Sequence, residues 1–166
     1  HKRTKYGVVG THVNLTARIE SYTVGGQILI SESTLQEVGP ILRIAQPMEI
    51  EAKGIDRPIT LYDVRGIGGA YDLFLPEEDE ILFSLHQGIP LRYTLLEGKY
   101  LDRTRLIGSL VKLSVQGGEI HSNTLVSLWS NIRIQLINLD GEPIPGHLYG
   151  KVVRQLSEED RGFVVH

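Results

Sequence analysis

The sequence predicts an α+β protein in two parts: a mixed helix-and-strand segment over residues 1–66 and an all-β segment over residues 81–166. Two observations predict this division. Apolar residues recur at helical spacing only in the first part, whereas the second part consists of short runs rich in Val, Ile and Leu between glycine turns. Between them, the stretch GIGGAYDLFLPEEDE combines glycines, a proline and a run of acids, so residues 67–80 are predicted to be a linker.

The first part is predicted to begin with the end of a strand over residues 6–10, followed by a helix. Leu15, Ile19 and Tyr22 recur at helical spacing from Thr11, which is the expected N-cap, until Gly25 and Gly26 stop the helix. A short strand (27–31), a short helix (32–38) and three further strands (41–45, 48–52 and 59–64) are expected to follow. Ser31 or Ser33 is the expected cap of the second helix, and Gly39-Pro40 its stop.

The second part is predicted to form a small closed or nearly closed antiparallel β-barrel, because regularly spaced short strands with tight turns are typical of that fold. Glycine turns at 97–98, 117–118 and 140–141 break the apolar runs. Gly117 and Gly118 are expected to supply positive φ, and Trp129 to start a strand and close one end of the barrel. The expected strands cover residues 89–96, 109–115, 119–123, 131–139, 147–156 and 162–166.

Composition narrows the classes of partner and of chemistry. The 166 residues are 41% hydrophobic and 22% charged, as in soluble globular proteins, and the formal charge is only −3. The charge therefore gives no reason to expect nucleic acid or an anionic membrane as partner. The absence of cysteine excludes disulfides and thiolate chemistry and fits a cytoplasmic protein. No apolar run reaches membrane-spanning length, and the first residues do not look like a signal peptide.

Asn14 and Arg18 are the first candidate site residues. Four residues apart, they share one face of the first predicted helix near its N-terminus, where exposed N–H groups favour an anion. Arg18 offers a planar cationic fork suited to phosphate oxygens, and Asn14 offers a donor and an acceptor suited to a sugar. Spacing alone also fits an ordinary solvated helix face, so the residues by themselves leave both interpretations open.

The segment YGVVGTHVNLTARIESYTVGGQILISEST, continued by EAKGIDRPITLYDV, resembles class III adenylyl and guanylyl cyclases over about residues 3–66. The resemblance implies the C-terminal part of a ferredoxin-like catalytic domain, and a homodimer. It implies that Asn14 orients the nucleotide ribose, that Arg18 stabilises charge on the triphosphate in the transition state, and that Lys53 reaches the terminal phosphates. The implied reaction is attack of the ribose 3′-oxygen on the α-phosphate of ATP or GTP, with Mg²⁺ or Mn²⁺ in the intact parent.

Two departures from the family pattern bear on activity. The family's two metal-binding aspartates lie upstream of this segment, so we expect this chain to be an inactive C-terminal fragment of a bacterial cyclase, with no cofactor bound. Where the family often has a base-reading Asp or Thr, this chain has Gly7, which leaves the choice between ATP and GTP open. His12 is expected to be an exposed residue at the start of the helix rather than a catalytic base.

The second part is similar to PilZ domains, bacterial β-barrel modules that often bind cyclic di-GMP. Lys112, Ser114 and Gly117 match the family's [Asp/Asn]-x-Ser-x-x-Gly turn, with Lys112 replacing the usual acid or amide. The family's arginine pair should fall near residues 82–89, where this chain has no arginine. Because those arginines stack on the guanines and pair with the phosphates, their absence argues against cyclic di-GMP binding.

Other side chains indicate no further chemistry. The six histidines share no metal-ligand spacing, so no metal site is predicted in this chain, and Ser114 lacks the context of a hydrolase nucleophile. Three hypotheses remain open. The chain is part of a nucleotidyl cyclase with a fused regulatory barrel, or a PilZ-like module that binds a ligand or partner on a degenerate cyclase scaffold, or an interaction and dimerisation scaffold.

Overall fold

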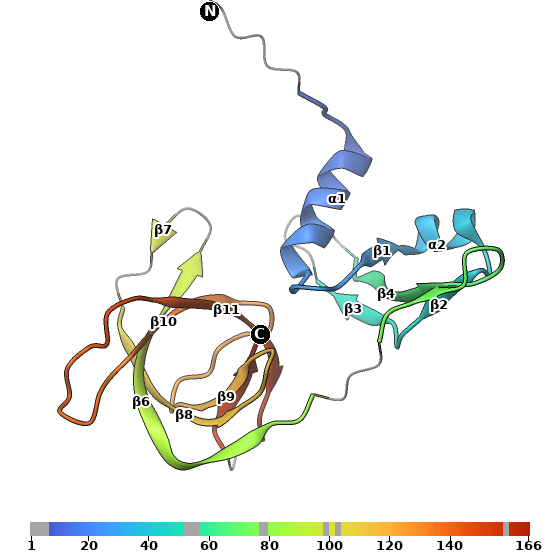
Figure 1. The fold of residues 1–166 in the computed structure, drawn as a ribbon. Helices are drawn as coiled ribbons and strands as arrows, with labels where there is room; N and C mark the ends of the chain where they lie inside the picture. The colour runs from blue at the N-terminus through green and yellow to red at the C-terminus, as the bar shows by residue number, and fades with distance from the viewer. Residues whose placement is uncertain (1–6, 52–56, 77–79, 98–99, 102–103, 158–159) are drawn as a thin grey trace, which may run out of the picture. The chain divides into compact units, whose positions relative to one another are not determined.

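The computed structural model describes residues 7–51, 57–76, 80–101 except 98–99, 104–157 and 160–166. The chain folds as two compact units, His1–Glu77 and Glu78–His166, and Figure 1 labels most of their helices and strands. The first unit holds both helices of the described residues, and the second is all β. The predicted α+β composition is therefore present, although sheet dominates.

The first unit is built around one long strand, β4 (Ile59–Ile67). Every other strand of this unit pairs with β4 in antiparallel fashion. Leu61 is paired with Ser31 on one side and with Met48 on the other, so two of the short strands flank β4. The short strands are β1 (Leu29–Ser31), β2 (Leu42–Ile44), β3 (Met48–Ile50) and β5 (Leu73–Phe74).

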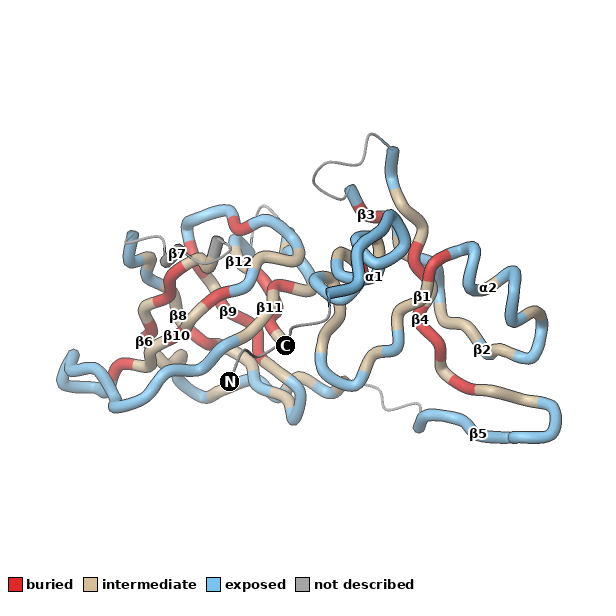
Figure 2. The backbone as a smooth tube through the Cα atoms, turned by 90° about the horizontal axis from the view of Figure 1, so that it is seen from above, coloured by how far each residue is buried: buried red, intermediate tan, exposed pale blue. Residues whose placement is uncertain are grey.

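Helix α1 (Thr11–Tyr22) packs on this sheet through the residues that predicted it. Ile19 forms a small core with Ile50 and Leu61, and Leu15 and Tyr22 pack against that core. Burial of such side chains contributes about 1.5–3 kcal/mol each. Figure 2 shows the buried residues of this unit along β4, with most of α1 exposed.

Helix α1 begins at Thr11, where the helical pattern was predicted to start, but its predicted cap was wrong. Gly10, with φ of 152°, is the N-cap and makes no side-chain hydrogen bond, and Thr11 is already helical. The described residues 7–10 form no strand. The helix also ends at Tyr22, three residues before Gly25, because the Thr23 N–H turns back to the Glu20 carbonyl at 3.0 Å.

The boundaries of α2 (Glu32–Val38) agree with the sequence prediction. The Ser31 side chain accepts a hydrogen bond from the Thr34 backbone N–H at 3.3 Å, which caps the helix. Gly39 ends it with φ of 79°, a conformation that glycine adopts without steric cost. The three expected strands after this helix are present as β2, β3 and β4.

Part of the segment predicted as a linker is folded into the first unit. Phe74 pairs with Gly66 in β4, and its ring occupies the space that a side chain at Gly66 would take. The Arg43 guanidinium lies 5.9 Å from the centre of the same ring. Gly66, one of the glycines on which the linker prediction rested, therefore leaves room for the Phe74 ring.

The second unit is a closed barrel of six antiparallel strands, as the turn pattern predicted. The strands follow one another around the barrel in the order β10-β11-β12-β9-β8-β6, and β10 pairs with β6 to close it. A short strand, β7 (Tyr100–Leu101), extends β6. The barrel strands are β6 (Phe83–Glu97), β8 (Leu106–Leu113), β9 (Gly118–His121), β10 (Asn131–Leu136), β11 (Leu148–Gln155) and β12 (Gly162–Val165).

The core of the barrel is apolar and contains a contact between two aromatic rings. Tyr93 and Phe163 are both 1% exposed, and their rings meet edge to face with centroids 5.5 Å apart. The Tyr93 hydroxyl lies 2.7 Å from the Ser122 hydroxyl, so its polar end is satisfied. Val126, from the connection between β9 and β10, is 2% exposed and belongs to the same core.

Two expectations about the barrel were wrong. Gly117 and Gly118 do not adopt positive φ. They are required for close packing instead, since a Cβ at Gly117 would collide with the Val165 carbonyl and one at Gly118 would lie 2.6 Å from Leu110 Cδ1. Trp129 lies before β10 rather than in it, with φ of 67°.

Candidate functional site

Helix α1 carries two of the three predicted nucleotide contacts. Asn14 is exposed and Arg18 is half-buried, and they are separated by one turn of the helix. The backbone N–H of Asn14 donates to the Gly10 carbonyl at 3.0 Å, which places Asn14 in the first turn. Since Leu15, Ile19 and Tyr22 pack toward the sheet, the position of α1 is fixed by apolar burial rather than by either polar side chain.

The Arg18 guanidinium has no ion-pair partner among the carboxylates that the structure describes. A guanidinium keeps its charge at any physiological pH and has five N–H donors in a planar fork. An anion at this face would therefore meet a cation whose donors are not already engaged by a described acid. The chemistry suits phosphate oxygens.

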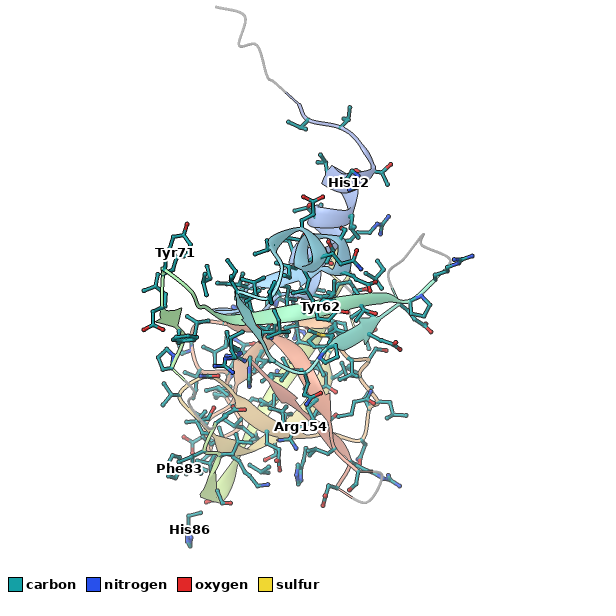
Figure 3. The ribbon with its side chains drawn as sticks, turned by 90° about the vertical axis from the view of Figure 1, so that its right-hand side faces the viewer. His12, Tyr62, Tyr71, Phe83, His86 and Arg154 are labelled. Atoms are coloured by element: carbon teal, nitrogen blue, oxygen red, sulfur yellow. The ribbon has the colours of Figure 1, made fainter. Side chains whose placement is uncertain are left out.

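Lys53, the third predicted contact, lies in the range 52–56, outside the described residues. His12 lies at the start of α1 and is exposed (Figure 3). Its backbone carbonyl accepts a hydrogen bond from the Thr16 hydroxyl at 2.9 Å. Exposure at a helix start is what the sequence predicted for His12.

The described part of the chain offers no fit for the metal ions that the cyclase resemblance implies. Mg²⁺ and Mn²⁺ are bound mainly by carboxylate oxygens. Across the described ranges, no three His, Asp or Glu side chains gather so that they could hold an ion.

A second polar cluster lies on the barrel, at the turn that resembles the PilZ motif. Ser114 accepts hydrogen bonds from the backbone N–H groups of Gln116 (3.2 Å) and Gly117 (2.9 Å), which fixes the turn between β8 and β9. Its hydroxyl donates to Glu80 Oε1 at 2.7 Å. The other oxygen of Glu80 lies 3.0 Å from His166 Nε2. The carboxylate thus joins the segment before β6, the turn and the residue after β12.

Glu80 is held in its charged form by this cluster. Partial burial by itself raises the pKa of the carboxyl. The hydrogen bonds from Ser114 and His166, with the positive charges of His166 and Arg154, outweigh burial and keep the pKa below its usual value of 4.5. A carboxylate therefore already accepts the hydrogen bond of the Ser114 hydroxyl at this turn.

Lys112, which replaces the acid or amide of the PilZ motif, takes part in an ion pair. Its Nζ lies 2.9 Å from Glu119 Oε1, and His121 Nε2 lies 3.3 Å from the same oxygen. Glu119 is 4% exposed, so both neighbours stabilise a buried carboxylate. The structural role of Lys112 accounts for its position in the turn.

Sequence reasoning missed the carboxylates at both of these positions. Glu80 was assigned to a solvated acidic run, and nothing local signals its contact with His166, 86 residues away. Glu119 follows Gly118 in an ordinary strand pattern. The ion pair between Lys112 of β8 and the buried Glu119 of β9 becomes visible only when the register of the two strands is known.

Comparison with known proteins gives a family match in the first unit of the chain. Residues 1–66 match the family model described as the adenylate and guanylate cyclase catalytic domain. The matched range contains Asn14, Arg18 and Lys53 and is similar to a portion of that domain. No curated protein matches the chain. Neither helix in the described residues is long and apolar enough to cross a membrane.

Proposed function

We propose that residues 1–66 are the C-terminal part of a bacterial class III nucleotidyl cyclase catalytic domain with a ferredoxin-like fold, and that the barrel is a fused PilZ-like regulatory module. The observation that carries this proposal is the match of residues 1–66 to the cyclase catalytic domain. The half-buried Arg18, without an ion-pair partner among the described carboxylates, supports it.

Arg18 and Asn14 have distinct roles in the proposed reaction. The Asn14 amide binds and orients the ribose, and the Arg18 guanidinium stabilises negative charge that develops on the triphosphate. Charge stabilisation of this kind by one preorganised donor contributes about 3–4 kcal/mol to the lowering of a barrier. Lys53 is proposed to bind the terminal phosphates of the same nucleotide.

The proposed reaction converts ATP or GTP to a cyclic nucleotide and pyrophosphate. The ribose 3′-oxygen forms a bond to the α-phosphorus as the bond from that phosphorus to the bridging oxygen of the β-phosphate breaks. The 3′-hydroxyl proton passes to solvent, and pyrophosphate carries away the electron pair. Proposed on the same basis are a cytoplasmic homodimer and, for the isolated 166-residue chain, no turnover, because no cluster of acids or histidines that could hold the metal ions gathers among the described residues.

The alternative is a ligand-binding or partner-binding barrel on a degenerate cyclase scaffold. It is favoured by the barrel's own polar pocket, described below, which does not involve any residue of the matched range. Under this alternative, Asn14 and Arg18 have no catalytic role.

Incubation of the intact parent protein, rather than of the isolated 166-residue chain, with ATP or GTP and Mn²⁺ tests the proposal. We expect cyclic AMP or cyclic GMP to appear together with an equal amount of pyrophosphate. Folded protein that yields neither product from either nucleotide would reject the enzyme and leave the scaffold. The preferred purine is read from the same experiment.

A further inference from the structure

One end of the barrel contains a polar pocket that the proposed cyclase chemistry does not use. Its volume is about 480 Å³, a size typical of sites for small molecules. Two parts of the chain form it: residues 122–126, which follow β9, and residues 155–157 and 161–162, at the end of β11 and the start of β12. Val126, which belongs to the barrel core, lines the pocket with Leu125 and Leu156, so part of its wall is apolar.

Hydrogen bonds hold the walls of this pocket in place. The Ser122 N–H donates to the Arg161 carbonyl at 2.9 Å, which ties the two parts of the chain together. The Ser122 hydroxyl accepts from the Thr124 N–H at 3.3 Å, and Gln155 Nε2 donates to the Val126 carbonyl at 2.8 Å. A site whose walls are already fixed loses little conformational entropy when a ligand binds.

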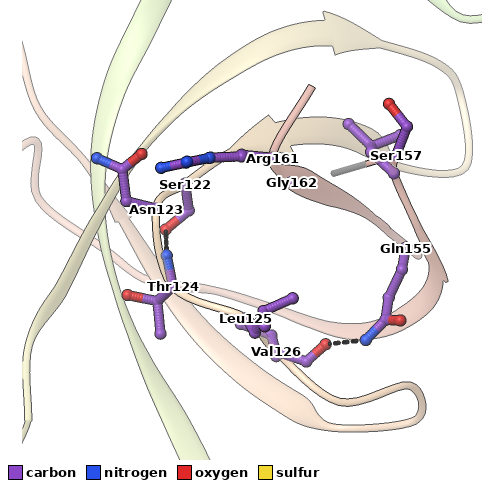
Figure 4. Close-up of a pocket in the computed structure, with 10 residues that line it drawn as sticks. Ser122, Asn123, Thr124, Leu125, Val126, Gln155, Ser157, Arg161 and Gly162 are labelled. Atoms are coloured by element: carbon purple, nitrogen blue, oxygen red, sulfur yellow. Dashed lines mark hydrogen bonds between the residues drawn. The ribbon is translucent and has the colours of Figure 1, made fainter. Parts of the chain in front are cut away.

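Three polar side chains of the pocket have no hydrogen-bond or ion-pair partner within the described residues: Asn123, Thr124 and Arg161. Figure 4 shows the Arg161 side chain extending toward Asn123 on one side of the pocket, with Gln155 on the opposite side. A guanidinium, a carboxamide and a hydroxyl that line one cavity can bind the oxygens of an anionic group.

The backbone of Arg161 has a positive φ. Its φ is 38°, in the left-handed region that disfavours side chains other than those of Gly, Asn and Asp. The next residue, Gly162, packs so closely on the Ile120 carbonyl that a Cβ would collide with it. The entry into β12 thus fixes the turn, and strain of this kind is concentrated at functional sites.

The charges near the pocket favour an anion with a single negative charge. Arg161 is the only cationic residue among the described residues that line it. The adjacent Asp160 carboxylate accepts a hydrogen bond from Ser157 at 3.0 Å and remains a local negative charge. A doubly charged phosphate would be repelled by that carboxylate, whereas one guanidinium balances one carboxylate and forms a bidentate pair with it.

We propose that this pocket binds a small organic molecule through a single carboxylate group, with Arg161 pairing with the carboxylate, Asn123 and Thr124 donating to it, and the body of the ligand packing on Val126 and Leu156. The proposal concerns only the barrel and stands whether or not residues 1–66 belong to a cyclase. It gives the barrel a chemical class of ligand distinct from a cyclic dinucleotide.

Titration of the 166-residue protein with three related probes, followed by the backbone amide NMR signals of Asn123, Thr124 and Gly162, tests this assignment. The probes are benzoate, its uncharged analogue benzamide, and phenyl phosphate. We expect saturable shifts with benzoate and at least about tenfold weaker binding of the other two, since each lacks or alters the charge that Arg161 pairs with. Equal shifts from benzoate and benzamide, no saturation with benzoate, or tighter binding of phenyl phosphate would each overturn the proposal.

Two variants and a matched control locate the site. Arg161→Gln should weaken benzoate binding about tenfold or more, and Asn123→Ala about threefold, because the first removes a charge and the second a neutral donor. Arg105→Gln, which removes an exposed arginine that does not line the pocket, should leave binding unchanged. A dispersed amide spectrum establishes that each variant is folded, and wild-type affinity in both pocket variants would contradict the proposal.

Discussion

The Ser114 hydroxyl donates a 2.7 Å hydrogen bond to Glu80, and this contact joins the segment before the first barrel strand to the turn between β8 and β9. His166 Nε2 lies 3.0 Å from the other oxygen of the same carboxylate. Three parts of the barrel that are far apart in sequence therefore meet at one carboxylate. The stability of this end of the barrel should depend on the charge of Glu80.

Replacement of Glu80 by Gln should lower the free energy of unfolding of the barrel by about 1 kcal/mol at pH 7, since it weakens two hydrogen bonds to a charged, partly buried group. The pKa of Glu80 is lower in the folded protein than its usual value of 4.5. The stability that the charge provides is therefore present above pH 4.5 and is lost as the pH falls through the folded-state pKa.

Urea unfolding of wild type and Glu80→Gln at a series of pH values measures this difference. Glu142→Gln is a suitable control, because it also neutralises an acid of the barrel, but an exposed one without an ion pair among the described residues. A difference between wild type and Glu80→Gln that stays constant from pH 7 to below pH 4 would contradict the account.

The same contact predicts that the protein does not bind cyclic di-GMP. A phosphate at the Ser114 turn would have to displace a carboxylate that already accepts the Ser114 hydrogen bond, and no described arginine lies in the range 82–89. Isothermal titration with cyclic di-GMP should give no saturable heat. Binding in the micromolar range would show that the resemblance to PilZ domains extends to their usual ligand.

Replacement of Gly117 by Ala should destabilise the barrel by about 3 kcal/mol or more, because the added methyl group collides with backbone, which cannot move aside as a flexible side chain would. Gly25→Ala is the matched control, since nothing lies within 4 Å of a Cβ at that turn and its φ is not positive. Thermal unfolding of both variants measures the contrast. Equal melting temperatures of the two variants would show that the turn at Gly117 can rearrange to accept a methyl group without loss of stability.

Arg161→Asn should separate stability from binding. Asn tolerates the left-handed backbone better than Arg, so we expect the free energy of unfolding to rise by up to about 1 kcal/mol. Benzoate binding should be lost in the same variant, because the guanidinium is gone. A destabilised variant would mean that Arg161 contributes to packing rather than to a ligand site.

The sequence was informative where a local pattern decides the structure. Ser31 and Gly39 bound α2 as capping chemistry predicts, and the repeated turns predicted a barrel that the pairing of β10 with β6 closes. Contacts between distant residues were not predictable in this way. Phe74 folds back onto Gly66, and Gly117 is needed because of Val165, so in both cases the partner is specified only by the fold.

The two candidate sites also differ in how far the sequence alone predicts them. Asn14 and Arg18 stand one helical turn apart, so their common placement on α1 follows from sequence spacing alone. The barrel pocket combines residues 122–126 with residues 155–157 and 161–162, and none of these stretches has a recognisable motif. Its polar side chains come together only because the β9–β10 crossover passes the β11–β12 hairpin at one end of a closed barrel.

The most direct test of the proposed cyclase is the rate of cyclic nucleotide formation by the natural protein when Arg18 is replaced by Ala. Loss of one transition-state donor should lower kcat about 10²- to 10³-fold with a much smaller change in KM. Arg43→Ala, which removes an exposed arginine of the same unit, should retain activity close to that of wild type. Equal rates for Arg18→Ala and wild type would contradict the account, because Arg18 would then have no part in the reaction.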